Sequence, residues 1–216
     1  MDLLLIDTEI RVLGALMEKE ATTPEYYPLS LNALTAACNQ KSNRSPVVSF
    51  DEQTVVRAID SLKEMQLAVQ SHSGRVPKYA HNFTKSHKLI NPEAAILCVL
   101  FLRGPQTIGE LRGRTERMHR FEGLEAVEES LSSLTEMGFV TKLPRQPGRK
   151  EHRYAHLLSG KPDIPEAAVE AKPEKATVIV RAENERIRVL EQEVAELKAE
   201  LAELQTSFEN FKSQFD

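Results

Sequence analysis

The sequence predicts a mostly α-helical protein with small β-hairpins, an α+β fold in which one structural unit is duplicated and a coiled-coil helix follows. Three observations predict this arrangement. Short strings recur in the two halves of residues 1–158, each half shows three helical stretches before two short strands, and residues 187–211 carry an unbroken heptad pattern. Self-similarity at a long, fixed spacing is typical of a duplicated unit.

The duplication is visible in three pairs of matching strings. They share one order and nearly one offset, which a chance match of a single short string would not produce. The pairs are residues 61–65 (SLKEM) with 133–137 (SLTEM), 74–75 (GR) with 148–149 (GR), and 78–81 (KYAH) with 153–156 (RYAH).

The first copy begins with apolar residues at helical spacing in residues 10–16, which predicts a buried helix face. Ser30 is a favourable N-cap for a second helix, and Asp51 is one for a third. Two strands are expected after the third helix, at residues 67–71 and 78–83.

The second copy repeats this order. We expect Asn91 to cap its first helix, and Thr107 with Glu110 to form a capping box for the second. Apolar residues at helical spacing in residues 124–134 predict the third helix, and the strands are expected at residues 139–143 and 152–157. Three helices followed by a hairpin is the plan of a winged-helix domain, whose helix-turn-helix part docks on DNA in many proteins.

The predicted domains are a winged-helix domain at residues 1–86 and a second at residues 87–158. A proline-containing linker follows at residues 159–177, and a coiled-coil helix occupies residues 178–216. β-Branched Ile187 and Val194 at two of the three a positions, with leucine at the d positions, favour a parallel two-stranded coil, so we predict a homodimer. The alternative is one amphipathic helix folded back on its own chain. The predicted dimer interface is Ile187, Leu190, Val194, Leu197, Leu201, Leu204, Phe208 and Phe211.

Composition argues against several classes of protein. The net charge is −4, and residues 159–216 hold eight basic and thirteen acidic side chains, so bulk charge does not favour coating of nucleic acid. Cys38 and Cys98 lack the spacing of a zinc site, which predicts a protein of the reducing cytoplasm without disulfides. The longest apolar run, residues 94–102, is far shorter than the roughly 20 residues of a membrane span.

No catalytic arrangement is apparent, and we predict a non-enzymatic protein without cofactor or metal. The six histidines are scattered, and neither a phosphate-binding glycine loop nor a nucleophile–base pair is suggested by spacing. His152 and His156 have the spacing of metal ligands on one side of a strand. However, His156 corresponds to His81 in the repeat, and His81 has no histidine four residues earlier, so both are predicted to be structural.

Basic side chains gather in the connectors between second and third helices and at the second hairpin. Such clusters at loop tips neutralise phosphates and position a duplex, although an ordinary solvated surface is the alternative. The predicted phosphate contacts are Lys41, Arg44, Arg112, Arg114, Arg117, Arg120, Arg149, Lys150 and Arg153.

Two features differ from a base-reading helix-turn-helix. The first connector, residues 40–50, is much longer than the usual three or four residues. Residues 122–136, which include the second copy's third helix, carry five glutamates and no lysine or arginine. A helix with this charge is repelled by the phosphates of a major groove, so any DNA contact should discriminate weakly between sequences.

The sequence resembles the YceH family of uncharacterised bacterial proteins along nearly its whole length. The most specific matches are Thr22-Thr23-Pro24-Glu25 and Cys38-Asn39-Gln40-Lys41. The resemblance implies a tandem winged-helix fold and a bacterial cytoplasmic setting, and it carries over no catalytic or binding residues.

The leading hypothesis is therefore a dimeric, nucleic-acid-associated protein of the transcription-regulator type. The rival is a protein–protein adaptor whose acidic third helices contact an unidentified protein partner. It would resemble the tandem winged-helix subunit of bacterial chromosome-condensation complexes. Neither hypothesis names a cognate DNA sequence or an effector ligand.

Overall fold

The computed structural model describes residues 3–71, 76–145 and 151–160, which belong to one compact unit. It is a mixed fold of helices and small antiparallel sheets, as the predicted α+β class requires. The predicted coiled coil at 178–216 and its eight interface residues lie outside the described residues. None of the described helices has the length and apolar character of a bilayer-spanning segment.

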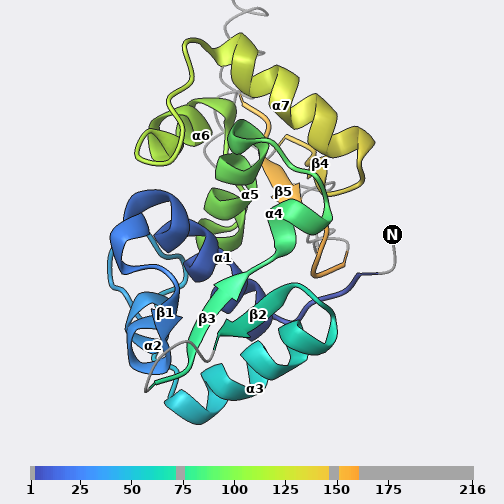
Figure 1. Cartoon of the computed structure of the whole chain (residues 1–216). Helices are drawn as coiled ribbons and strands as arrows, with labels where there is room; N and C mark the ends of the chain where they lie inside the picture. The colour runs from blue at the N-terminus through green and yellow to red at the C-terminus, as the bar shows by residue number, and fades with distance from the viewer. Residues whose placement is uncertain (1–2, 72–75, 146–150, 161–216) are drawn as a thin grey trace, which may run out of the picture. The chain divides into compact units, whose positions relative to one another are not determined.

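The first half contains three main helices and a three-stranded antiparallel sheet of order β1-β3-β2 (Figure 1). Strands β2 and β3 pair with Val69 opposite Ala80. Sequence analysis missed strand β1 and the two short helices, which are too short to show periodicity. The elements are α1 (Asp7–Thr22), η1 (Pro24–Tyr26), β1 (Leu29–Ser30), α2 (Leu31–Cys38), α3 (Glu52–Glu64), β2 (Ala68–Ser71), β3 (Lys78–His81) and α4 (Phe83–Ser86).

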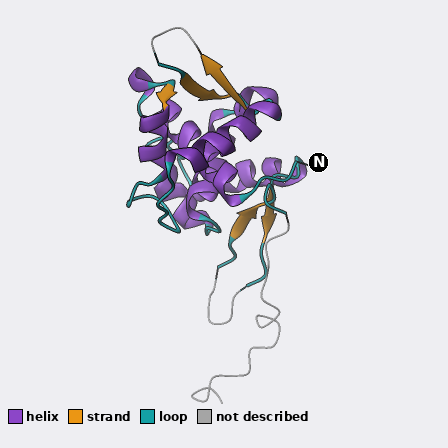
Figure 2. Ribbon diagram, turned by 90° about the horizontal axis from the view of Figure 1, so that it is seen from below, coloured by secondary structure: helices purple, strands orange, loops and turns teal. Residues whose placement is uncertain are grey.

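The second half repeats three helices and an antiparallel strand pair, in the predicted order. Strands β4 and β5 pair with Thr141 opposite Ala155. In Figure 2 the helices gather between the two groups of strands. The elements are α5 (Asn91–Arg103), α6 (Ile108–Thr115), α7 (Leu124–Glu136), β4 (Val140–Lys142) and β5 (Tyr154–His156).

Three of the four predicted helix caps are confirmed. Ser30 Oγ accepts a hydrogen bond from Ala33 N at 3.3 Å, and Asp51 Oδ1 accepts one from Thr54 N at 2.7 Å. The predicted capping box of α6 is also present, with Thr107 bonded to Glu110. These bonds satisfy backbone N–H groups that have no partner within the helix.

The expected cap at Asn91 is wrong. Asn91 is the first residue of α5, and Ile90 precedes it in the N-cap position. The Ile90 N–H donates to Glu93 Oε2 at 3.0 Å, so an acidic side chain within the helix replaces the cap side chain. The predicted strand end at Phe83 is corrected too, because Phe83 begins α4 and is fully buried.

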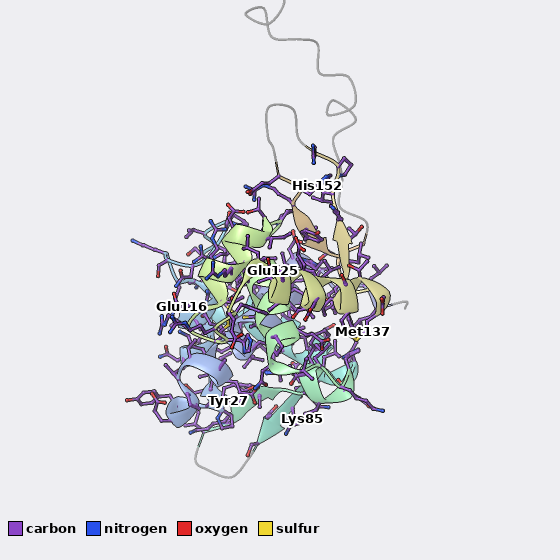
Figure 3. The ribbon with its side chains drawn as sticks, turned by 90° about the horizontal axis from the view of Figure 1, so that it is seen from above. Tyr27, Lys85, Glu116, Glu125, Met137 and His152 are labelled. Atoms are coloured by element: carbon purple, nitrogen blue, oxygen red, sulfur yellow. The ribbon has the colours of Figure 1, made fainter. Side chains whose placement is uncertain are left out.

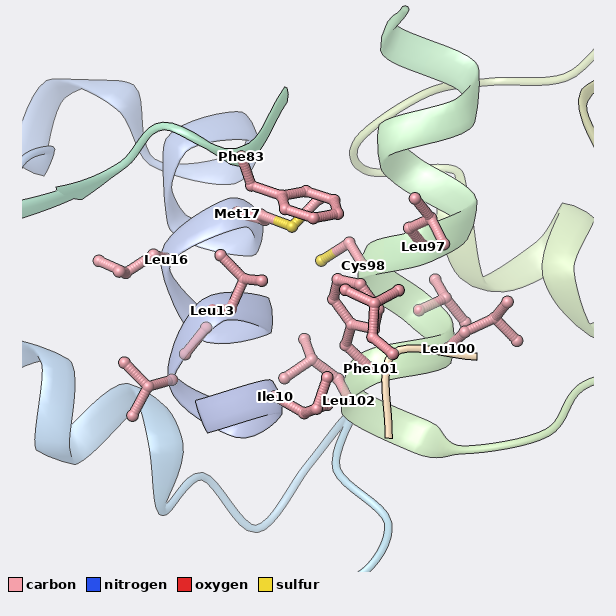
Figure 4. Packing of buried hydrophobic residues seen from close by; sticks show 14 of the residues in the cluster. Ile10, Leu13, Leu16, Met17, Phe83, Leu97, Cys98, Leu100, Phe101 and Leu102 are labelled. Atoms are coloured by element: carbon pink, nitrogen blue, oxygen red, sulfur yellow. The ribbon is translucent and has the colours of Figure 1, made fainter. Parts of the chain in front are cut away.

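One hydrophobic core runs through both halves, because α1 packs along α5. Figure 4 shows the side chains of the two helices facing each other. The helices lie close together at Gly14, where an added Cβ would lie 3.0 Å from both Leu102 Cδ2 and Phe101 Cβ. The Cys98 thiol donates to the Gly14 carbonyl at 3.5 Å. The predicted boundary at residues 86 and 87 therefore lies between two halves with a shared interior.

Both cysteines are buried, as their positions on inner helix faces predict. Burial raises the pKa of the Cys38 thiol to about 12 and the pKa of Cys98 still further. Both side chains are therefore neutral, unreactive parts of the core at ordinary pH.

Candidate nucleic-acid interface

Helix α6 and the loop after it hold four of the nine predicted phosphate contacts. Thr107 fixes the start of α6, and buried Leu111 anchors its inner side in the core. The opposite side carries Arg112, which is exposed, and the loop at residues 116–123 carries Arg117 and Arg120, which are also exposed. Residues 112–120 therefore hold four arginines, of which three are exposed and one, Arg114, is half-buried.

The first-half connector meets this region of the second half. Ser45 N donates to the Leu102 carbonyl at 2.9 Å, which fixes the connector against the end of α5. The Arg103 guanidinium at that end donates to Asn43 Oδ1 of the connector. Beside this contact lies a groove of about 200 Å³. Its charged lining is Arg103, Arg114 and Arg117 together with Glu18 and Glu116, so the arginines exceed the carboxylates by one.

Sequence analysis missed Arg103. Nothing in its local sequence marks it, since its position in the groove depends on how α5 packs against the other half. Burial lowers the pKa of Arg103, and the nearby charge of Arg114 lowers it further. An arginine remains protonated at any physiological pH, so this desolvated guanidinium keeps its charge beside the groove.

Carboxylates compensate part of this positive charge. Glu110 on α6 lies 3.5 Å from Arg114 Nη2 and 2.8 Å from Arg153 Nη1. Burial raises the pKa of Glu110, but the Thr107 backbone bond and Arg153 outweigh it, so its pKa lies below the usual value. Arg120 is 4.0 Å from Glu116, and this exposed pair is weak enough to yield to a phosphate.

Arg153 connects the second hairpin to α6. Its Nη1 donates to the Pro105 carbonyl at 2.7 Å and to Glu110 at 2.8 Å. The side chain remains partly exposed, so it stays at the edge of the arginine set with its charge largely neutralised. Lys41 is exposed on the first-half connector. Arg149 and Lys150 lie outside the described residues.

The expectation that Arg44 contacts phosphate is corrected by the structure. Its side chain is 0% exposed and makes a bidentate ion pair with Glu18, at 3.0 and 2.6 Å. The same guanidinium donates to the carbonyls of Ala37 and Asn43. Arg44 therefore holds the connector to α1 and α2 and does not present its charge to a ligand.

The outer face of α7 carries the opposite charge. Glu125, Glu128, Glu129 and Glu136 are exposed and line a shallow groove together with two serines. Figure 3 labels Glu125 on this helix and Glu116 in the loop that precedes it. Among the described residues none of these four glutamates forms an ion pair, so their charge is available to a basic partner.

The histidines that repeat at the end of each hairpin have structural partners. His81 Nε2 is 2.7 Å from Glu20 Oε2, and its backbone N–H donates to Tyr27 Oη. The His156 ring packs edge-on against Phe101 at 5.1 Å between centroids, and burial lowers its pKa to about 4. Within the described part of the chain, no cluster of three potential metal ligands is found.

These features define an α+β protein with a repeated helical unit, one shared core and an arginine-lined groove between its halves. Residues 5–149 match the family described as "Protein of unknown function, DUF480". The chain is 57% identical over 219 residues to a UPF0502 protein of Geotalea uraniireducens and 54% identical over 217 residues to one of Solibacter usitatus. Both alignments cover 100% of each chain. The protein therefore belongs to the DUF480 (UPF0502) family of bacterial proteins.

Proposed function

We propose that this chain is a non-enzymatic, dimeric tandem winged-helix protein that binds duplex DNA in the cytoplasm. The main support is the gathering of three second-half arginines around one groove, where Arg103, Arg114 and Arg117 lie beside Asn43 of the first-half connector. Guanidinium groups bind phosphate through paired hydrogen bonds, and several together release counterions from a duplex. The winged-helix form is supported by the repeated order of three helices and a strand pair.

The proposed contact uses α6, the 116–123 loop and the connector, and it leaves the third helix out of the major groove. The exposed glutamates of α7 would meet phosphates there with repulsion and no compensating base contact. Arginines that contact phosphates position a protein without reading sequence. We therefore expect weak discrimination between duplex sequences.

Dimerisation is proposed through the heptad seam at residues 178–216. A second copy doubles the number of phosphates contacted at once, which raises affinity without any new kind of contact. Analytical ultracentrifugation of the full chain and of a chain ending at residue 185 tests this step. A monomer in both samples removes the dimer from the proposal.

Binding is tested by fluorescence anisotropy of a labelled random-sequence duplex, titrated with the full chain at several salt concentrations. The test variant replaces Arg112, Arg117 and Arg120 with glutamine. Each lost phosphate contact lowers the slope of log affinity against log salt by roughly 0.9, so the slope should fall by about 3.

A matched control replaces three exposed cations outside the set, Arg57, Lys78 and Lys142, with glutamine. It changes the net charge equally and should keep most of the affinity and the parent slope. If the two triple variants weaken duplex binding equally, the affinity depends only on the net charge of the protein and not on these arginines. No binding of the parent chain in low salt, with the dimer intact, would remove the DNA proposal.

The adaptor function is a second candidate, favoured by the exposed carboxylates of α7. Charge reversal with Glu125→Lys and Glu129→Lys separates the two. The DNA proposal expects unchanged or tighter duplex binding, because repulsion is removed. The adaptor hypothesis expects the charge-reversed chain to lose an associated protein in pull-downs. It also expects the glutamine variant of Arg112, Arg117 and Arg120 to bind duplex no more weakly than the parent chain.

A further inference from the structure

A second hollow lies at the junction of the two halves and adjoins the arginine groove at Met118, which lines both. Its volume is about 590 Å³, within the range of about 300–1,000 Å³ that is usual for small-molecule sites. It lies between the end of α1, the segment that runs from β3 through α4, and the first turns of α5. Junctions between structural units are preferred places for ligand sites.

The inner part of this cavity is apolar and built from soft side chains. Met17 of α1 and Cys98 of α5, which point toward each other in Figure 4, line its base, and Met118 follows from the loop after α6. Methionine adapts its shape to an apolar ligand more readily than branched side chains do. Both halves therefore contribute to one apolar floor.

The outer part of the cavity is cationic. Lys85 of α4, labelled in Figure 3, and Lys88 in the following turn are exposed at its rim, with Asn91 beside them. Glu20 is the one carboxylate in the lining, and it is hydrogen-bonded to the buried ring of His81. Among the described residues neither lysine has an ion-pair partner, so the rim carries net positive charge.

Lys88 adopts a left-handed backbone conformation, as Asn43 and Gln66 also do. Its φ is 54°, in the left-handed region where glycine and asparagine are favoured. The position follows the end of α4, where glycine would complete the turn at lower cost. Lysine here carries a conformational cost that the turn itself does not require.

We propose that this cavity binds a small organic anion, whose apolar body contacts Met17, Cys98 and Met118 and whose charged group is held by Lys85 and Lys88. A carboxylate with a short hydrocarbon chain has the required chemistry. The site adjoins the proposed duplex-binding surface at Met118 of the 116–123 loop, but Lys85 and Lys88 are not among the proposed phosphate contacts, so the two proposals are tested by different variants.

Octanoate, below its micelle concentration, is a suitable probe, and methionine methyl groups report where it binds. In the full chain labelled with ¹³C-methyl methionine, octanoate should shift the Met17 and Met118 signals saturably. Met65 and Met137 lie outside the cavity lining and should not move. Single methionine-to-leucine variants assign the signals. Absence of saturable shifts at Met17 and Met118, or equal shifts at all four, would overturn the proposal.

The anionic part of the proposal has its own test. Lys85→Gln combined with Lys88→Asn should weaken octanoate at least fivefold, and asparagine suits the left-handed conformation at position 88. The control, Lys78→Gln with Lys142→Gln, removes the same charge from exposed strand positions and should leave affinity unchanged. Neutral octanol should bind more weakly than octanoate. If octanol binds equally well, or the control weakens octanoate as much, the lysines do not hold an anion.

Discussion

Replacing Arg44 distinguishes a structural role for this residue from a phosphate contact. The change Arg44→Met removes a guanidinium whose side chain is 0% exposed and leaves Glu18, 12% exposed, without its partner. Removal of one member of a buried ion pair costs about 3–5 kcal/mol. Because Glu18 keeps some contact with water, we expect a loss near the lower end, about 3 kcal/mol.

The free energy of unfolding can be followed by tyrosine fluorescence in urea. All four tyrosines lie between residues 26 and 154, so the signal follows the described unit and not the C-terminal segment. The double variant Arg44→Met with Glu18→Leu should recover much of the loss, because it leaves no unpaired charge. The coupling energy between the two sites should then be at least about 2 kcal/mol.

The opposite result is equally clear. Suppose that the free energy of unfolding of Arg44→Met lies within about 1 kcal/mol of the parent value, while its duplex binding is severalfold weaker. The ion pair then does not hold the connector. The original prediction of a phosphate contact would then stand, and the structural role assigned to Arg44 would be wrong.

Three further predictions concern the shared core. Gly14→Ala should lower the free energy of unfolding, measured in urea, by about 1–3 kcal/mol, because the new methyl group meets α5. Gly113→Ala on α6 is the control, because its methyl group meets nothing within 4 Å, and it should raise the free energy of unfolding by about 0.5–1 kcal/mol. His156 has a folded pKa of about 4, lowered from 6.5 by burial, so the folded state favours the neutral ring. The stability that comes from keeping this ring neutral is fully present above pH 6.5. The free energy of unfolding should fall by roughly 3 kcal/mol as the pH drops to 4, and His156→Phe should reduce this dependence on pH. Cys38 and Cys98 should resist a thiol reagent in the folded chain and react on unfolding; fast reaction in native buffer would contradict their burial.

The elements that local sequence determines were predictable, and those that depend on distant contacts were not. Ser30, Asp51 and Thr107 were identified as caps because a cap and its partner lie three residues apart. Asn91 was misassigned because it precedes Pro92, a residue favoured at the first helical position, whereas the helix starts one residue earlier and Glu93 bonds the Ile90 amide. Arg44 was misassigned for a different reason.

A connector rich in polar residues has the composition of an exposed loop, and composition carries no information on what the loop packs against. Arg44 bonds to Glu18, which lies 26 residues earlier, and Ser45 bonds to Leu102, which lies 57 residues later. Such contacts exist only once α1 has packed against α5. The same packing brings the half-buried Arg103 into the groove, which is why neither the burial of Arg44 nor the position of Arg103 was visible in the sequence.

The two copies use the same segment in different ways. The first connector, residues 39–51, is anchored to α1 by Arg44 and by the bond from Arg11 Nη2 to the Pro46 carbonyl, and to α5 by Ser45. It covers the seam where the halves meet at Gly14. The second connector, residues 116–123, borders the junction of the halves through Met118, and its arginines remain exposed. Substitutions in the first connector should therefore cost stability, and neutralising the arginines of the second should cost duplex binding at nearly constant stability.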